Sequence, residues 1–179
     1  MSVKNVFNDD QWFLIGVVPG MIGAAMSNAA PSGIIGTIKE MSAVMRATIH
    51  GKKDFPESEL INELMQKAAN WEEAKEKMSD YRERAKARVE SAEIKTREDL
   101  QSLALDDCKA ALKLVDAHCS DADAKAYRQW TLNVARAVAE AAKEGSILGF
   151  GGERVSEPER KLLAELEQVL GLTGGVLTA

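Results

Sequence analysis

The stretch from Gln11 to Ile38 contains twenty-eight consecutive residues without a formal charge, in a chain of which 28% is charged. A helix that is apolar on every side must be buried in protein or lie in lipid. Pro31, flanked by alanine, serine and glycine, indicates a break between two helices. The sequence therefore predicts a buried apolar hairpin over residues 11–50, around which the other helices pack.

Side chains of two sizes alternate around the first helix of this hairpin. Gly16 and Gly20 belong to a row of small residues, and we expect that row to admit a neighbouring backbone. On the second helix, a bulky row at helical spacing predicts the buried face. That row is Ile34, Ile38, Met41, Met45 and Ile49.

A membrane location is an alternative for this hairpin. The nineteen uncharged residues from Trp12 to Ala30 make about 28 Å of helix, close to the roughly 30 Å of a hydrocarbon core. Pro19, Ser27 and Asn28 and the absence of a basic flank argue against insertion. We weigh a spanning helix and a surface-associated hairpin, and we prefer a hairpin buried within a cytoplasmic protein.

The composition predicts an all-α fold. Ala, Glu, Lys, Leu and Met are abundant and proline occurs four times, a pattern typical of helical proteins. We expect one domain over residues 1–179, a bundle of about six or seven helices, with 173–179 as a loose tail. The net charge of −5 gives no general attraction to nucleic acid. Cys108 and Cys119 form no CxxC pair, which indicates reduced thiols.

Several helix boundaries are predicted by capping residues. Thr96, Ser120 and Ser156 each precede an acidic residue by three positions, the spacing of a capping box. Asp54 is a further predicted cap, for a helix with Pro56 in its first turn. Trp12-x-Leu14 and Trp130-x-Leu132 each precede an alanine-rich helix, which is compatible with a weak internal duplication.

A long charged helix is predicted over residues 71–95. Twelve of the nineteen residues from Glu72 to Glu90 are charged, and a narrow apolar row runs between them at steps of three and four. We expect Trp71, Met78 and Tyr81 in this row to receive a partner helix, from a second copy or from another protein.

Candidate sites for chemistry are few. Lys39 and Glu40, just beyond the uncharged stretch, are candidate ligand-binding residues together with Arg46, because a carboxylate buried there needs a partner. Ligand-type side chains crowd one turn between helices, but capping already explains some of them, and no zinc or calcium motif is present. These weak metal candidates are Asp116, His118, Asp121 and Asp123. No nucleophile motif, phosphate loop or ExxH pair occurs, so we expect no catalytic residue and no cofactor.

The segment from Gly152 to Arg160 (GERVSEPER), followed by Leu162, Leu163 and Leu166, resembles a pattern in TerB-like tellurite-resistance domains. The resemblance implies an all-helical fold and a stress-associated or membrane-complex adaptor without established catalysis. Members of that family often carry an aspartate before the glycine, in a cluster suspected of binding metal. Here Phe150-Gly151-Gly152 occupies that place, which argues against a metal role.

The leading hypothesis from the sequence is a non-catalytic helical interaction or adaptor protein that self-associates through residues 71–95. The alternative is a bundle that binds an apolar small molecule or a metal ion between its first two helices. An enzyme ranks third.

Overall fold

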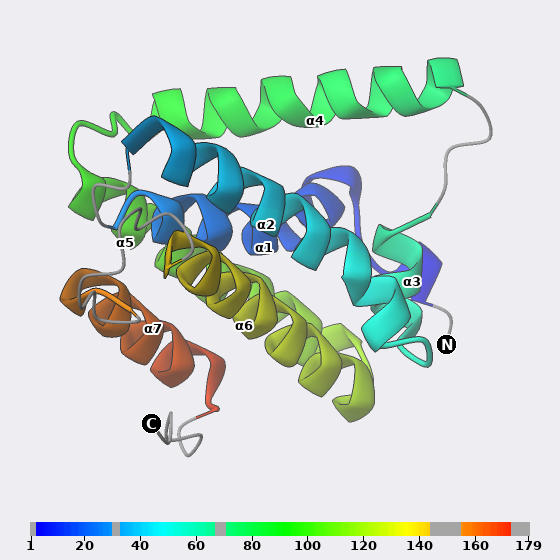
Figure 1. The fold of residues 1–179 in the computed structure, drawn as a ribbon. Coiled ribbons are helices and arrows are strands. Elements are labelled where there is room, and N and C mark those ends of the chain that lie inside the picture. Colours follow the sequence, from blue (N-terminus) through cyan, green and yellow to red (C-terminus); the bar gives the residue numbers. More distant parts are fainter. Residues whose placement is uncertain (1–2, 30–32, 67–70, 144–154, 173–179) are drawn as a thin grey trace.

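The computed structural model describes residues 3–29, 33–66, 71–143 and 155–172, except the side chains of 33–42, 71, 74, 75, 78, 142 and 143. These ranges contain a short 3-10 turn and seven α-helices and no strand (Figure 1). The helices are α1 (Asp9–Ser27), α2 (Gly33–Asp54), α3 (Glu59–Leu64), α4 (Trp71–Ser91), α5 (Arg97–His118), α6 (Asp121–Lys143) and α7 (Glu157–Leu170). The predicted all-α bundle is confirmed.

Helix α1 is the centre of the bundle, as the uncharged stretch predicts. It packs against α2, α5 and α6, while α7 covers α5 and α6 (Figure 1). Ile15, Val18 and Met26 of α1 are completely buried. None of the described helices contains an apolar stretch that could span a lipid bilayer.

Proline inside α1 leaves one backbone carbonyl without its helical donor. Pro19 has no N–H group for the carbonyl of Ile15, four residues earlier. The hydroxyl of Tyr127, on α6, donates a hydrogen bond of 2.7 Å to that carbonyl. Tyr127 is fully buried, and burial raises the pKa of its hydroxyl well above the usual value. The donor thus stays protonated, and it joins α1 to α6.

Helix α2 is oriented differently from the prediction. Met45 and Ile49, expected in the buried row, expose 59% and 62% of their surface. The slim side of the helix packs instead: Ala43 is buried, and a Cβ atom added at Gly51 would lie 2.7 Å from Cε2 of Trp130. The indole of Trp130, on α6, packs directly against the backbone at Gly51, where a side chain would leave no room for it. With this face of α2 packed on α6, the bulky side of α2 faces solvent. Ile34, Ile38 and Met41 fall outside the described side chains.

The end of α2 also differs from the prediction. The helix continues through Gly51 to Asp54, instead of ending near His50. Asp54 therefore belongs to α2, and the N-cap of α3 is Ser58, whose hydroxyl accepts from the N–H of Ile61.

A close approach between α1 and α2 occurs at a glycine that lies outside the predicted row of small residues. A Cβ atom at Gly23 would lie 2.8 Å from Cγ2 of Val44, on α2. Among the described residues, nothing lies within 4 Å of the same position at Gly20, so the expected close contact there is not found.

The predicted caps at Thr96, Ser120 and Ser156 are confirmed by hydrogen bonds to the N–H groups three residues later. Gly171 ends α7 with φ = 65°, a left-handed conformation that favours glycine.

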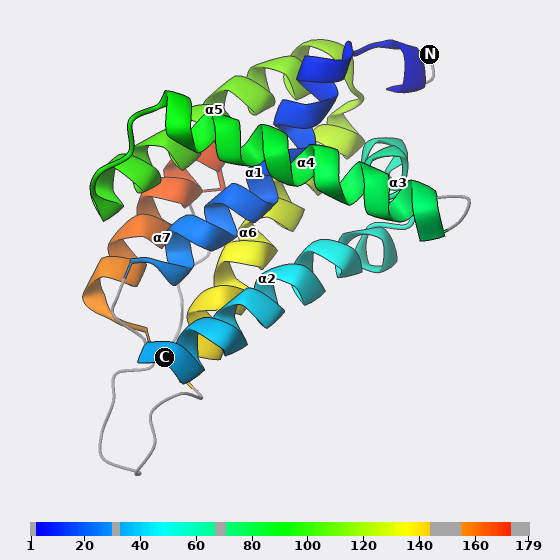
Figure 2. The ribbon, with the colours of Figure 1, turned by 90° about the horizontal axis from the view of Figure 1, so that it is seen from above.

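Helix α4 lies across the outside of the bundle, above α1 (Figures 1 and 2). The pair Arg88–Asp107 fastens its C-terminal half to α5. Asp107 is 2% exposed, and hydrogen bonding to this carboxylate raises the pKa of Arg88. Arg84 reaches Asp10 of α1 at 2.7 Å. Long side chains therefore hold much of α4 in place, and they leave space beneath it.

Candidate ligand-binding site

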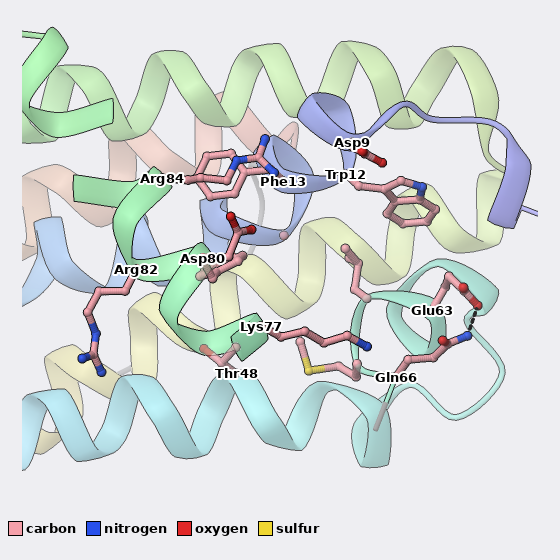
Figure 3. A pocket seen from close by; sticks show the side chains of 14 residues that line it. Asp9, Trp12, Phe13, Thr48, Glu63, Gln66, Lys77, Asp80, Arg82 and Arg84 are labelled. Carbon is pink, nitrogen blue, oxygen red and sulfur yellow. Dashed lines mark hydrogen bonds between the residues drawn. The ribbon is translucent and has the colours of Figure 1, made fainter. Parts of the chain in front are cut away.

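A cavity of about 920 Å³ lies beneath α4, bounded by α1, α2 and the α3 region (Figure 3). Its volume falls within the roughly 300–1,000 Å³ that is typical of small-molecule sites. The lining residues are Asp9, Trp12, Phe13, Gly16, Thr48, Glu63, Leu64, Met65, Gln66, Lys77, Asp80, Tyr81, Arg82 and Arg84. The pocket thus combines residues from four parts of the chain.

The floor of the pocket comes from the first turns of α1, where Trp12, Phe13 and Gly16 line it. A Cβ atom at Gly16 would lie 3.4 Å from Cδ2 of Leu64 and 3.5 Å from the hydroxyl oxygen of Tyr81. These are tight but permitted contacts, so alanine would fit at this position and a longer side chain would enter the pocket.

The wall on the α4 side is built by Tyr81 and Arg84. The ring of Tyr81 meets Phe13 edge to face, with 5.3 Å between the ring centroids. The guanidinium of Arg84 lies 4.2 Å from the centroid of Phe13, a cation–π distance. Phe13 therefore anchors the outer helix to the central one.

One hydroxyl group at the pocket is buried without a hydrogen-bond partner among the residues that the structure describes. The Thr48 Oγ1 atom is buried and unpaired. Tyr81 exposes 40% of its surface, but its hydroxyl end lies against Gly16, and burial raises the pKa of that group. Buried polar atoms are nearly always paired, so the unpaired Thr48 hydroxyl indicates where a ligand can bond.

Charged side chains surround the apolar floor, and several are already paired. Glu63 accepts a hydrogen bond of 2.7 Å from Gln66 (Figure 3), and Lys77 forms an ion pair of 2.7 Å with Glu73. Asp80 and Arg82 line the same opening from α4. Among the lining residues that the structure describes, acidic and basic groups are balanced, so these residues do not select strongly for a ligand of one charge.

Arg46, a ligand-binding residue predicted from the sequence, is not among the described residues that line this pocket. Arg46 is exposed on α2, and the side chains of Lys39 and Glu40 lie outside the described residues. Of the predicted interaction residues, Tyr81 is directed at α1, while the side chains of Trp71 and Met78 are also outside the described set.

The weak metal candidates have other roles. Asp116 accepts two hydrogen bonds of 2.7 Å from Arg128, and His118 packs edge-on against Phe7. Asp121 is exposed in the first turn of α6. Throughout the described ranges, no group of three His, Cys, Asp or Glu residues is placed to hold a metal ion.

Asp123 joins the starts of two helices. Its carboxylate accepts from the hydroxyls of Ser58 and Ser120, each at 2.7 Å, and from the N–H of Leu60 at 3.2 Å. Burial raises the pKa of this carboxyl, but these bonds and one from the N–H of Glu59 outweigh it, so the net shift is downward. Asp123 is therefore a structural anion.

Sequence patterns contain little sign of this pocket. They place Trp12 and Gly16 in the bulky and small rows of a buried helix, and they do not single out Thr48. Two adjacent aromatic residues, Trp12 and Phe13, are the available signal. Successive positions on a helix point about 100° apart, so one neighbouring helix cannot cover both side chains.

No protein-family model, no characterised protein and no solved structure matches this chain.

Proposed function

We propose that the protein is a non-catalytic helical binding protein, and that the pocket beneath α4 holds a small molecule with an apolar body and one uncharged hydrogen-bonding group. The proposal rests on one observation: the buried, unpaired hydroxyl of Thr48 occurs at a cavity floored by apolar side chains. Such a combination of apolar lining and a few polar atoms is typical of ligand sites.

Medium-chain alcohols fit this description, and decanol is a suitable test ligand. Displacement of the fluorescent dye anilinonaphthalene sulfonate by decanol measures its affinity. Gly16→Leu places a side chain in the pocket and should weaken decanol binding by about tenfold or more, because the apolar contacts of the ligand are lost.

Gly20→Leu is the matched control. Gly20 lies one turn further along α1, with nothing described within 4 Å of an added Cβ atom. It should retain decanol affinity within about twofold, since Gly20 is not among the described residues that line the pocket. Equal affinity in wild type and Gly16→Leu would refute the proposed site.

Self-association through α4 is the second candidate. Tyr81 is one of three large hydrophobic residues that the described chain exposes. We expect Tyr81→Ala with Met78→Ala to shift a dimer toward monomer in light scattering coupled to size exclusion. A wild-type protein that is monomeric over the whole concentration series would eliminate this candidate. The pocket is favoured because Tyr81 already packs on Phe13 within its own chain.

A further inference from the structure

The outer side of α2 carries two exposed apolar residues one turn apart. Met45 and Ile49 expose 59% and 62% of their surface, and residues four apart lie on the same face of a helix. In Figure 2, α2 lies at the margin of the bundle. The two exposed side chains therefore form an apolar ridge on the outer side of α2. The pocket is a separate feature, to which α2 contributes Thr48.

Basic side chains surround this ridge. Arg46, Lys52 and Lys53 are exposed on the same half of α2, as is His50, and Asp54 is the one acidic residue between positions 43 and 54. The whole chain carries a net charge of −5, so the sign of this cluster is opposite to that of the chain. Local charge of this kind complements an anionic surface.

We propose that the outer face of α2 docks on a membrane surface containing anionic phospholipid. A ridge of apolar side chains flanked by lysine and arginine can enter the headgroup region, with the apolar ends below and the cations beside the phosphates. A partner protein would need a groove of matching shape, whereas a fluid bilayer adapts to a ridge. A second copy docking face to face would bring the basic groups together. In this arrangement the outer face of α2 binds at the surface of the bilayer and does not cross it.

Cosedimentation of the full chain with vesicles tests the proposal. One set of vesicles contains phosphatidylcholine alone, and the other contains one third phosphatidylserine. We expect binding at least about tenfold tighter to the second set, decreasing as salt screens the charges. Met45→Gln with Ile49→Gln, and separately Lys52→Gln with Lys53→Gln, should each weaken binding by about tenfold or more.

Lys109→Gln with Lys161→Gln is the charge-matched control, because both lysines are exposed on other helices. This variant should bind like wild type. All substituted residues are exposed, so each variant should keep the helical circular dichroism of the wild type. Equal binding to both vesicle types, no binding to either, or an equal loss in the control would each overturn the proposal, as would concentration-dependent dimerisation abolished by Met45→Gln with Ile49→Gln.

Discussion

The hydroxyl of Tyr127 donates a 2.7 Å hydrogen bond to the carbonyl of Ile15, the group that Pro19 leaves without a helical donor. The two residues are 112 positions apart in the chain. The carbonyl of Ile15 and the buried hydroxyl of Tyr127 thus satisfy each other's hydrogen bonding.

Tyr127→Phe should lower the free energy of unfolding by about 1–3 kcal/mol, because it leaves a buried carbonyl unpaired. In a Pro19→Ala background, the new alanine supplies the missing N–H, so the same substitution should cost less. Urea denaturation of the four proteins in this double-mutant cycle measures the coupling. Strict additivity would contradict the compensation.

Gly51→Ala should destabilise the protein by about 1–3 kcal/mol, since the new Cβ atom overpacks against the indole of Trp130. Gly20→Ala is its control within a helix. It meets no described neighbour within 4 Å and should raise stability by about 0.5–1 kcal/mol through reduced backbone entropy. Thermal and urea unfolding give both values. A neutral or stabilising Gly51→Ala would mean that Trp130 can move aside without cost.

Asp123→Asn should destabilise the protein by about 2 kcal/mol near neutral pH, because charge-assisted hydrogen bonds to two helix starts are weakened. The folded-state pKa of Asp123 is lowered from 3.8, so its contribution is complete above that pH and is lost as the pH falls through the lower, folded-state value. The difference in unfolding free energy between wild type and variant should therefore shrink below about pH 4.

Asp116→Asn serves as the control for this pH series. Asp116 is half exposed in its ion pair with Arg128, and such pairs contribute about 0–1 kcal/mol. A constant difference between wild type and Asp123→Asn from neutral pH down to about pH 2 would show that the charge of Asp123 has no part in its effect.

Thr48→Val should stabilise the ligand-free protein by about 1 kcal/mol, because it removes a buried hydroxyl without a partner. The same variant should bind decanol more weakly. Thr131→Val makes the same chemical change at a buried hydroxyl that donates to the carbonyl of Tyr127 at 2.9 Å, and it should not stabilise. Differential scanning calorimetry and dye displacement measure the two effects, and loss of stability in Thr48→Val would argue against an unpaired hydroxyl.

Local signals predicted the starts of α5, α6 and α7. The caps at Thr96, Ser120 and Ser156 depend on residues within three positions of each other, so sequence alone contains the necessary information. The burial of α1 was also predicted from the sequence, because a stretch of twenty-eight uncharged residues is stable only inside a protein or in lipid.

Tertiary contacts decided the rest. The orientation of α2 depends on the fit between Gly51 and Trp130, which are far apart in the chain, and the row of bulky residues predicted the opposite face. The pocket was missed because it forms from α1, α2, α4 and the α3 region together, and only the docked position of α4 brings Tyr81 to Gly16.

The location of a bound ligand tests the central claim most directly. In an NMR spectrum of the protein with decanol, we predict nuclear Overhauser effects from the alkyl chain to the indole of Trp12 and to the methyl groups of Leu64 and Met65. Contacts to Met45 and Ile49 instead, or no contacts at saturating decanol, would contradict a binding site beneath α4.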